Sequence, residues 1–557
     1  MSEVRLSREM RLLDRLRAKR PMMAGPFVAV ARPKEWMVLL AFVLMLGGPT
    51  PVVLSAQALS SATIADLNAA FDAGTLTSEQ LVGLYLARIE AFDQQGPALN
   101  TVLWLNDNAL QTARALDAER RSRGPRSPLH GIPVVLKDNV DTSDMPTTAG
   151  SVLLAGSIPP DDAFLVQRLR AAGAIILAKV NMSEFASGST MSSNGGYIRN
   201  PHDIARSPSG SSGGTGASIA ASFAQLGIGT DTGGSVRGPS TSNGIVGLKP
   251  TLGLVSRDGI VPLALRFDTG GPMARSVYDV AAMLSVIAGP DPADPATENS
   301  RSRVSADYTT FLDAGSLNGA RIGVARQFMG GDEEVDWIMN AAIESMRQAG
   351  ATVVDVAVPQ WLVDVKGDWY TTIRWREFRD QIPDYLETIG PSYPKTLSDL
   401  VERSQAIMST TPEGGTPNPA RWTLFQQEEA SGLLTDHEYV AMRDHGLPMV
   451  RSLIEGLMAS QRLSAIVYPT SPTRPELVAG GGGGTPSATN LANLTGFPDL
   501  IVPAGFTSDR LPVGISFFGP AFSEPTLLGL GYAFEQRTRA RRDPATTPMR
   551  SGDVIGR

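Results

Sequence analysis

The 557-residue sequence contains no cysteine, and this absence removes several kinds of chemistry. A thiol nucleophile, a disulfide framework and a thiolate metal site are all excluded. Histidine is almost as scarce, because His130, His202, His437 and His445 are the only four, and their spacing matches no HExxH or similar metal-ligand pattern. We therefore predict no bound metal and no other cofactor, and expect serine, threonine or a carboxylate to perform any covalent step.

Long hydrophobic runs are also rare. The apolar run Trp36–Leu46 has 11 residues, fewer than the roughly 20 that span a bilayer. Nine basic residues precede this run, and Ala56–Ala58 offers a small-x-small cleavage site, a pattern typical of a secretory signal peptide. We predict a leader at 1–58 that is removed, which places the remaining 59–557 in the periplasm or outside the cell. An uncleaved leader anchored in the inner membrane, or a later start codon, are the alternatives.

Dense runs of basic residues are missing beyond this leader, except for the small cluster Arg537–Arg542. The leader carries nine basic and four acidic residues, so its removal would change the net charge from −7 to −12. Nucleic-acid binding needs clustered Lys and Arg that displace counterions. We therefore predict no nucleic-acid partner, and a membrane contact only through an uncleaved leader; the oligomeric state has no signature in the sequence.

What is present indicates a large α/β fold. A helix pattern at 163–172 is followed by an apolar strand at 174–178, and the same order recurs at 334–350 and 351–356. Thr77 begins one of two expected helices within 61–96. Further elements are predicted as strands at 321–325, 464–468 and 500–503 and a last helix near 525–537. The sheet therefore draws its strands from distant parts of the chain.

Two segments interrupt this alternation. The segment 367–445 is polar, helical in pattern and rich in Trp, Tyr and Arg, so we expect a helical cap that covers the substrate pocket. The second is the run of five glycines at 480–484, which predicts a flexible loop or a lid hinge, with an inert connector as the alternative.

The segment 207–251 is so rich in Ser, Gly and Thr that we expect a loop there and not part of the core. Within it, Gly229–Ser235 (GTDTGGS) offers an uncovered hydroxyl, glycines that let a substrate approach, and consecutive N–H groups that can point at one oxygen. Upstream, the apolar strand at 130–137 ends on Lys137. These features together indicate acyl transfer.

The same residues resemble the amidase signature family over nearly the whole chain after the leader. The matching motifs are VVLKDN (134–139), AKVNMSEF (178–185), SPSGSSGG (207–214), GTDTGGSVR (229–237), VGLKPT (246–251), DTGGP (268–272) and LPVGI (511–515). Within the family, the closing segment 488–541 is most similar to the bacterial peptide amidases. The resemblance implies a large central mixed β-sheet flanked by helices, with the 367–445 cap as an insertion in one catalytic domain, 59–557.

The resemblance also implies a Ser-Ser-Lys triad. Ser235 corresponds to the nucleophile, Ser211 to a bridging serine that follows a cis peptide bond, and Lys137 to the base. A lysine can act as a base only if desolvation lowers its pKa enough to leave it uncharged. Ser211 would then relay the proton between Ser235 and Lys137.

Other residues of the same motifs would support this chemistry. We expect the backbone N–H groups of Thr232, Gly233, Gly234 and Ser235 to hold the oxyanion of the tetrahedral intermediate. Asp231 and Arg237 would pair and fix the loop, and Ser212 would hydrogen-bond near Lys137.

A rival mechanism uses a different serine. Gly210–Gly214 also matches G-x-S-x-G, the nucleophile elbow of α/β-hydrolases, which would make Ser212 the nucleophile and His437 or His445 the base. However, no apolar strand leads into Gly210, as an elbow requires. The alternative that the Gly/Ser-rich stretch is merely a linker conflicts with the joint occurrence of Lys137, Ser211 and Ser235 in the order of the family.

The sequence therefore predicts an exported hydrolase of linear carbon-nitrogen amide bonds that forms an acyl-enzyme intermediate. Peptide amides and aryl or aliphatic amides are the expected substrates. One alternative is the amidase subunit of a tRNA-dependent amidotransferase, which export and an acidic surface oppose. The other is a non-catalytic amide-binding protein, which an intact triad opposes.

Overall fold

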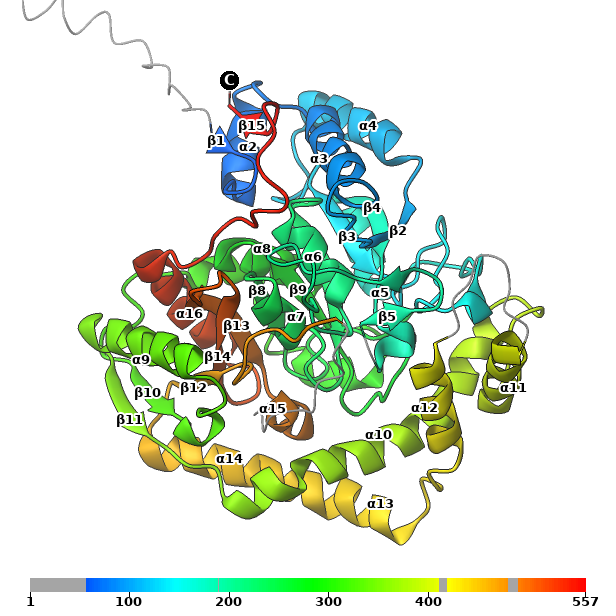
Figure 1. The fold of residues 1–557 in the computed structure, drawn as a ribbon. Helices are drawn as coiled ribbons and strands as arrows, with labels where there is room; N and C mark the ends of the chain where they lie inside the picture. The colour runs from blue at the N-terminus through cyan, green and yellow to red at the C-terminus, as the bar shows by residue number, and fades with distance from the viewer. Residues whose placement is uncertain (1–56, 189, 410–417, 479–488, 557) are drawn as a thin grey trace, which may run out of the picture. The chain divides into compact units, whose positions relative to one another are not determined.

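A mixed β-sheet of 11 strands forms the centre of the computed structural model, which describes residues 57–188, 190–409, 418–478 and 489–556 (Figure 1). From one edge to the other, the strands are β11 (Thr352–Asp355), β10 (Arg321–Val324), β12 (Ala465–Pro469), β14 (Pro512–Phe518), β13 (Asp499–Phe506), β8 (Val246–Lys249), β9 (Thr269–Ala274), β7 (Leu226–Asp231), β3 (Pro133–Lys137), β4 (Ile175–Val180) and β2 (Val102–Leu105). The predicted mixed sheet is confirmed.

The directions of the central strands bring several motifs to one edge of this sheet. β3 runs parallel to β4 and β7, whereas β9 runs antiparallel to β7 and β8. The carboxyl ends of β3, β7 and β8 therefore lie at the same edge as the amino end of β9. Lys137 and Asp231, the last residues of β3 and β7, meet there.

Helices flank the sheet, as the sequence predicts. Their bounds are α2 (Ile64–Asp72), α3 (Ser78–Phe92), α4 (Ala109–Arg123), α5 (Phe164–Ala171), α6 (Gly213–Ala220), α7 (Arg237–Ser242), α8 (Val277–Ile287), α9 (Glu333–Gln348), α10 (Gln360–Thr388), α11 (Leu397–Ser409), α12 (Pro419–Glu429), α13 (His437–Ala441), α14 (Leu447–Gln461), α15 (Thr489–Thr495) and α16 (Glu524–Thr538). Thr77 caps α3 as expected, in a capping box with Gln80.

The prediction of a loop at 207–251 is wrong, because this segment forms α6, β7, α7 and β8 and is buried over most of its length. Its small residues allow close packing. A Cβ atom at Gly214 of α6 would lie 2.1 Å from the carbonyl oxygen of Asn181, and one at Gly227 of β7 would lie 2.5 Å from the Thr215 methyl group. The glycines therefore bring helix and strand together at the centre of the fold.

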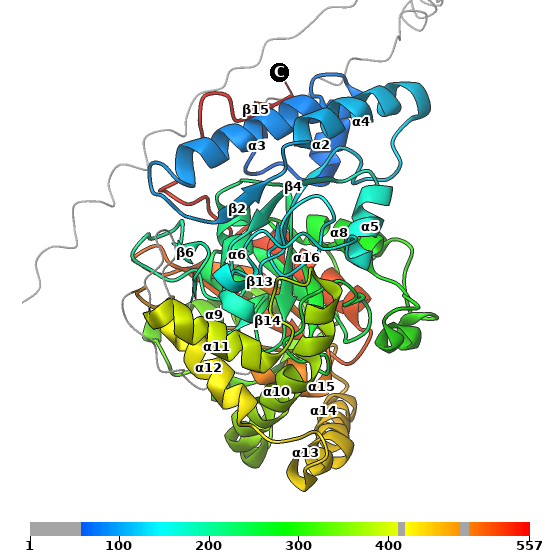
Figure 2. The same ribbon diagram turned by 90° about the vertical axis from the view of Figure 1, so that its right-hand side faces the viewer.

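The helical cap is present but extends beyond the predicted range 367–445. Its helices run from Gln360 in α10 to Gln461 in α14 (Figures 1 and 2). Gly367 lies inside α10, and His445 lies in a π-helical turn that joins α13 to α14. The polar composition located only the middle of this segment in the sequence. Its last helix, α14, was not included because it is amphipathic: it buries Val450, Ile454 and Met458 in an apolar cluster with β12 and β14.

Two predicted segments lie outside the described residues: the leader as far as residue 56, and the five glycines at 480–484. The last two residues of the predicted leader form β1 (Gln57–Ala58), which pairs antiparallel with β15 (Val554–Ile555). Within the described ranges, no helix is long and apolar enough to cross a membrane.

Candidate active site

Lys137 is the buried centre of the candidate site. Its position at the end of β3, between β4 and β7, leaves the side chain with no exposed surface. The Nζ atom donates hydrogen bonds to Ser211 Oγ and Thr230 Oγ1, both at 2.7 Å, and to the Thr230 carbonyl oxygen at 3.4 Å. Burial lowers the pKa of Lys137 from 10.5 to about 7, although the charges of Asp231 and Asp268 act in the opposite direction.

Ser211 lies directly before α6 and is buried. The peptide bond between Gly210 and Ser211 is cis, as the family resemblance implies. The Ser183 N–H donates to the Ser211 carbonyl oxygen at 3.0 Å, and the Ser212 N–H donates to the Ser235 carbonyl oxygen at 3.2 Å. The segment that carries Ser211 is thereby hydrogen-bonded to the loop that carries Ser235.

Ser235 lies in the loop between β7 and α7, and is half-buried. Its hydroxyl has no hydrogen-bond partner within the described residues. The structure thus joins Lys137 to Ser211 directly, and places Ser235 on the adjoining loop with its hydroxyl uncommitted.

The Asp231 carboxylate organises this loop. It accepts hydrogen bonds from the Gly234 N–H at 2.9 Å and the Val236 N–H at 3.0 Å. The Gly234 N–H, one of the four predicted oxyanion donors, is therefore directed at Asp231. The other three, the N–H groups of Thr232, Gly233 and Ser235, have no acceptor in the described part of the protein.

The expected pairing of Asp231 with Arg237 is present and belongs to a larger buried network. Arg237 forms ion pairs with Asp231 at 3.1 Å and with Asp499 at 3.2 Å. Asn493 of α15 donates to Asp231 at 2.9 Å and accepts from Arg237 at 2.6 Å. Burial alone would raise the pKa of Asp231, but the charge of Arg237 outweighs it and holds this pKa well below its usual range. The network holds the loop through Asp231 and links it to α15 and β13.

Ser212 supports the site indirectly. Its hydroxyl donates to the Thr230 carbonyl oxygen and accepts from the Thr230 N–H, both at 3.2 Å. Because Thr230 contacts Lys137 through its side chain and its carbonyl group, Ser212 positions the partner of the lysine. This geometry leaves Ser212 unsuited to be a nucleophile, and His437 and His445 are exposed on the cap with no hydrogen bond to it in the described ranges. The geometry of Ser212 and of these two histidines therefore does not support the elbow hypothesis.

Sequence reasoning missed several residues that complete the site. Asn139 donates to Thr230 Oγ1 at 3.1 Å, and Thr232 Oγ1 donates to Asp268 at 2.5 Å. Asp268 also accepts from the N–H groups of Leu263 and Ala264, and burial raises its pKa. The signal for Asn139, Thr230 and Asp268 was their position inside the family motifs.

Tyr370 of α10 brings the cap onto the loop that carries Ser235. A Cβ atom at Gly233 would lie only 2.5 Å from the Tyr370 hydroxyl oxygen, so only glycine fits beneath this side chain. The Tyr370 ring stacks on Phe267, with ring centroids 5.6 Å apart. An aromatic pair therefore lies beside Gly233 in this loop.

No group of three or more His, Asp or Glu side chains in the described ranges is arranged to hold a metal ion. The chemistry that this arrangement supports uses a base, a hydroxyl relay, a nucleophilic hydroxyl and backbone N–H donors.

Comparisons with known proteins show the family and the fold of the chain. The family model named Amidase matches residues 80–528. The chain is 34% identical over 520 residues to a probable amidase of Arabidopsis thaliana. This match covers 90% of this chain and 95% of that protein. It is also 36% identical to a glutamyl-tRNA(Gln) amidotransferase subunit of Myxococcus xanthus, over 86% of this chain and 97% of that protein.

Among solved structures, the native peptide amidase from Stenotrophomonas maltophilia superimposes with a TM-score of 0.80 at 41% sequence identity. The match covers 87% of this chain and 98% of the peptide amidase. A peptide amidase in complex with the competitive inhibitor chymostatin matches with a TM-score of 0.81 at 42% identity, over 87% of this chain and 99% of that one.

Proposed function

Because the chain belongs to the amidase family, we propose that it hydrolyses linear carbon-nitrogen amide bonds, with Ser235 as nucleophile, Ser211 as relay and Lys137 as base. Membership of the family and the likeness to peptide amidase make it a hydrolase of carbon-nitrogen bonds. The observation that carries the finer proposal is the buried Lys137 amine, 2.7 Å from the Ser211 hydroxyl.

The contacts of Lys137 suit the role of a base. An uncharged amine has two N–H bonds and one lone pair. Thr230 offers two acceptors to the amine, its hydroxyl and its carbonyl oxygen. If both N–H bonds point at Thr230, the lone pair faces the Ser211 hydroxyl and can take its proton. Asn139 also donates to the Thr230 hydroxyl and so keeps that oxygen an acceptor.

The reaction then proceeds in two halves. Ser235 Oγ attacks the amide carbon while its proton passes through Ser211 to Lys137, and the carbonyl oxygen becomes negatively charged. The N–H groups of Thr232, Gly233 and Ser235 stabilise that charge. The proton returns through Ser211 to the leaving nitrogen as the C–N bond breaks. Water, deprotonated by the same route, then hydrolyses the acyl-enzyme ester.

The substitution Ser235→Ala tests this proposal. We expect it to reduce kcat for release of ammonia from peptide amides by at least about 10³-fold, as loss of a nucleophile does in other serine hydrolases. The matched control is the His437→Ala, His445→Ala double variant, which should keep the parental rate. Parental activity in Ser235→Ala would rule out this nucleophile.

Peptide amides and aryl amides are the substrates that we propose. The likeness to peptide amidase supports the first. The aromatic surface of Tyr370 and Phe267 beside the loop supports amides with an apolar or aromatic group next to the scissile bond. A panel of peptide amides, benzamides, anilides and acetamide, with ammonia and amine release measured separately, would rank these classes. A preference for acetamide would contradict this substrate choice.

The similarity to glutamyl-tRNA(Gln) amidotransferase subunits supports a second candidate, glutamine hydrolysis within a multi-subunit enzyme. Two measurements separate it from the first. Glutaminase activity well above the activity on peptide amides, together with co-purification of companion subunits from the native cell, would favour the amidotransferase.

We also propose that the protein is exported, supported by the basic and apolar pattern of its leader. Fractionation of the native cell, with immunodetection and amino-terminal sequencing, tests this proposal. Recovery of the protein in the cytosol with its leader intact would contradict it. Recovery in the membrane would favour the uncleaved anchor.

A further inference from the structure

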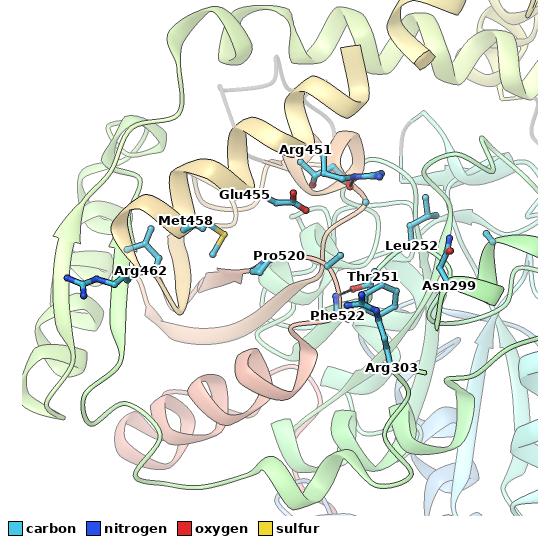
Figure 3. A pocket seen from close by; sticks show the side chains of 16 residues that line it. Thr251, Leu252, Asn299, Arg303, Arg451, Glu455, Met458, Arg462, Pro520 and Phe522 are labelled. Atoms are coloured by element: carbon cyan, nitrogen blue, oxygen red, sulfur yellow. Dashed lines mark hydrogen bonds between the residues drawn. The ribbon is translucent and has the colours of Figure 1, made fainter. Parts of the chain in front are cut away.

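A cavity of about 800 Å³ (Figure 3) has a lining that includes none of Lys137, Ser211 and Ser235. This volume is within the range of about 300 to 1,000 Å³ that is typical of small-molecule sites. Its walls come from α14, the end of α15, the loop after β8, the segment around Asn299 and the loop between β14 and α16. Thr495 of α15 borders the cavity, while Asn493, two residues earlier and so on the other side of the helix, contacts Asp231.

Two guanidinium groups border this cavity without a carboxylate partner in the described residues. The Arg303 guanidinium lies over the Phe522 ring, 4.9 Å from its centroid. Arg451 and Arg303 are both exposed to solvent; Arg451 Nε donates to the Thr495 carbonyl oxygen at 3.0 Å, which leaves its two terminal NH₂ groups uncommitted in the described structure. A planar guanidinium held in this way presents paired donors to a carboxylate or phosphate.

Glu455 adds the opposite charge to the same wall. It follows Arg451 by four residues on α14, and its carboxylate points into the space beside the helix (Figure 3). No cation of the described chain pairs with it. Met458, Leu252 and Phe522 give the cavity an apolar surface. Arg462 also borders it, but Figure 3 shows its guanidinium directed away from Arg303 and Phe522.

We propose that this cavity is a second binding site, for a zwitterion of the amino acid or short peptide class. The ligand carboxylate would bind Arg303 and Arg451, its ammonium group would bind Glu455, and its apolar side chains would pack on Met458 and Phe522. Glu455 disfavours a phosphate dianion, because it would repel that charge, whereas it complements an ammonium group. The proposal goes beyond the amidase activity and does not depend on it.

Calorimetric titration of the full chain carrying Ser235→Ala tests this site, with the dipeptide leucyl-leucine as the probe. We expect saturable binding of the dipeptide. Leucyl-leucine amide lacks the carboxylate and N-acetyl-leucyl-leucine lacks the ammonium group, so each should bind at this second site at least tenfold more weakly. Leucyl-leucine amide is also a peptide amide, so any binding of it that is insensitive to Arg303 and Arg451 is assigned to the proposed catalytic site.

Variants then locate the bound dipeptide. We expect Arg303→Gln and Arg451→Gln each to weaken leucyl-leucine at least tenfold and to leave the residual binding of its amide unchanged. The Glu455→Gln variant should bind leucyl-leucine and N-acetyl-leucyl-leucine with equal affinity. The control Arg462→Gln should bind as tightly as the parent, because its guanidinium points away.

The proposal is overturned if leucyl-leucine does not bind saturably, if the arginine variants bind it normally, or if the acetylated dipeptide binds equally well. Binding at the catalytic site alone would appear as titration that is insensitive to Arg303 and Arg451. Peptide amide hydrolysis by the Arg451→Gln variant with Ser235 intact provides a separate assay, so that loss of the second site and failure of the amidase proposal are distinguishable.

Discussion

Lys137 derives its character from its place in the sheet. It ends a strand that is paired on both sides, so the amine is removed from water and surrounded by hydroxyl and carbonyl oxygens. Desolvation destabilises the charged form of the amine by more than the hydrogen bonds to these neutral partners stabilise it. A residue that is usually a surface cation is therefore poised to be uncharged near neutral pH.

This burial predicts the pH dependence of the reaction. Because the pKa of Lys137 is lowered to about 7 and the uncharged amine is the active form, kcat/KM should rise with pH through about 7 and level off above it. Initial rates with a neutral peptide amide from pH 5 to 9 measure this profile. A flat profile, or one that still rises at pH 9 without a plateau, would exclude Lys137 as the base.

The buried Arg237 network predicts a large effect on stability. Arg237→Leu would leave Asp231 and Asp499 without their cation, so we expect a loss of about 3 to 5 kcal/mol in the free energy of unfolding. The control is Arg301→Leu at the exposed pair with Glu298, which should change it by less than about 1 kcal/mol. Urea denaturation measures both; equal effects would show that the network is not stabilising.

Residue identity was easier to predict than residue contact. Lys137, Ser211 and the Asp231–Arg237 pair were found from motifs, because each motif marks a local backbone arrangement. The donation of the Gly234 N–H to Asp231 was not predicted, since it depends on the conformation of the loop. Asn493 and Asp499 were missed because they come from a distant segment that meets the loop only in the folded chain.

At the scale of elements, the glycine-rich centre shows why composition misled the prediction at 207–251. Glycine and serine are common in loops, but they also allow a helix to lie unusually close to a strand. α6 and β7 use them in the second way. The bounds of strands with apolar β-branched runs, such as β4 and β12, were predicted to within two residues. Such runs are typical of buried strands and not of loops.

Two glycine substitutions test this interpretation. Gly214→Ala in α6 would place a methyl group 2.1 Å from the Asn181 carbonyl oxygen, so we expect a loss of about 1 to 3 kcal/mol in stability. Gly367→Ala in α10 has nothing within 4 Å of the new methyl group and should instead stabilise by about 0.5 to 1 kcal/mol. Thermal and urea unfolding measure whether each variant is more or less stable than the parent. A more stable Gly214→Ala variant would contradict the close-packing interpretation.

At the scale of the whole molecule, β1 raises a question about the predicted cleavage site. Cleavage after Ala58 would remove Gln57 and Ala58, which pair with Ile555 and Val554. Cleavage a few residues earlier would keep this pairing. The prediction of a leader rests on local composition, whereas the strand that pairs with Gln57 and Ala58 lies almost 500 residues away in the sequence.

Two chains that begin at residues 55 and 59 test the contribution of β1. The shorter chain lacks the strand, so we expect its free energy of unfolding to be lower by about 1 to 2 kcal/mol, the typical contribution of one or two hydrogen bonds. Urea midpoints measure this difference, and kcat on a peptide amide should be equal for both chains because β1 is remote from Lys137. Identical midpoints would show that β1 adds nothing.

The pairing of β1 with β15 also brings the two ends of the described part of the chain, residues 57 and 556, close to each other. A short Gly/Ser bridge from the end of β15 to the start of β1 would join them, and new ends could then be opened in an exposed turn such as the one at 313–316. Such a circular permutant would carry the leader, a tag or a surface anchor at a site chosen by the experimenter, with the catalytic sheet uninterrupted.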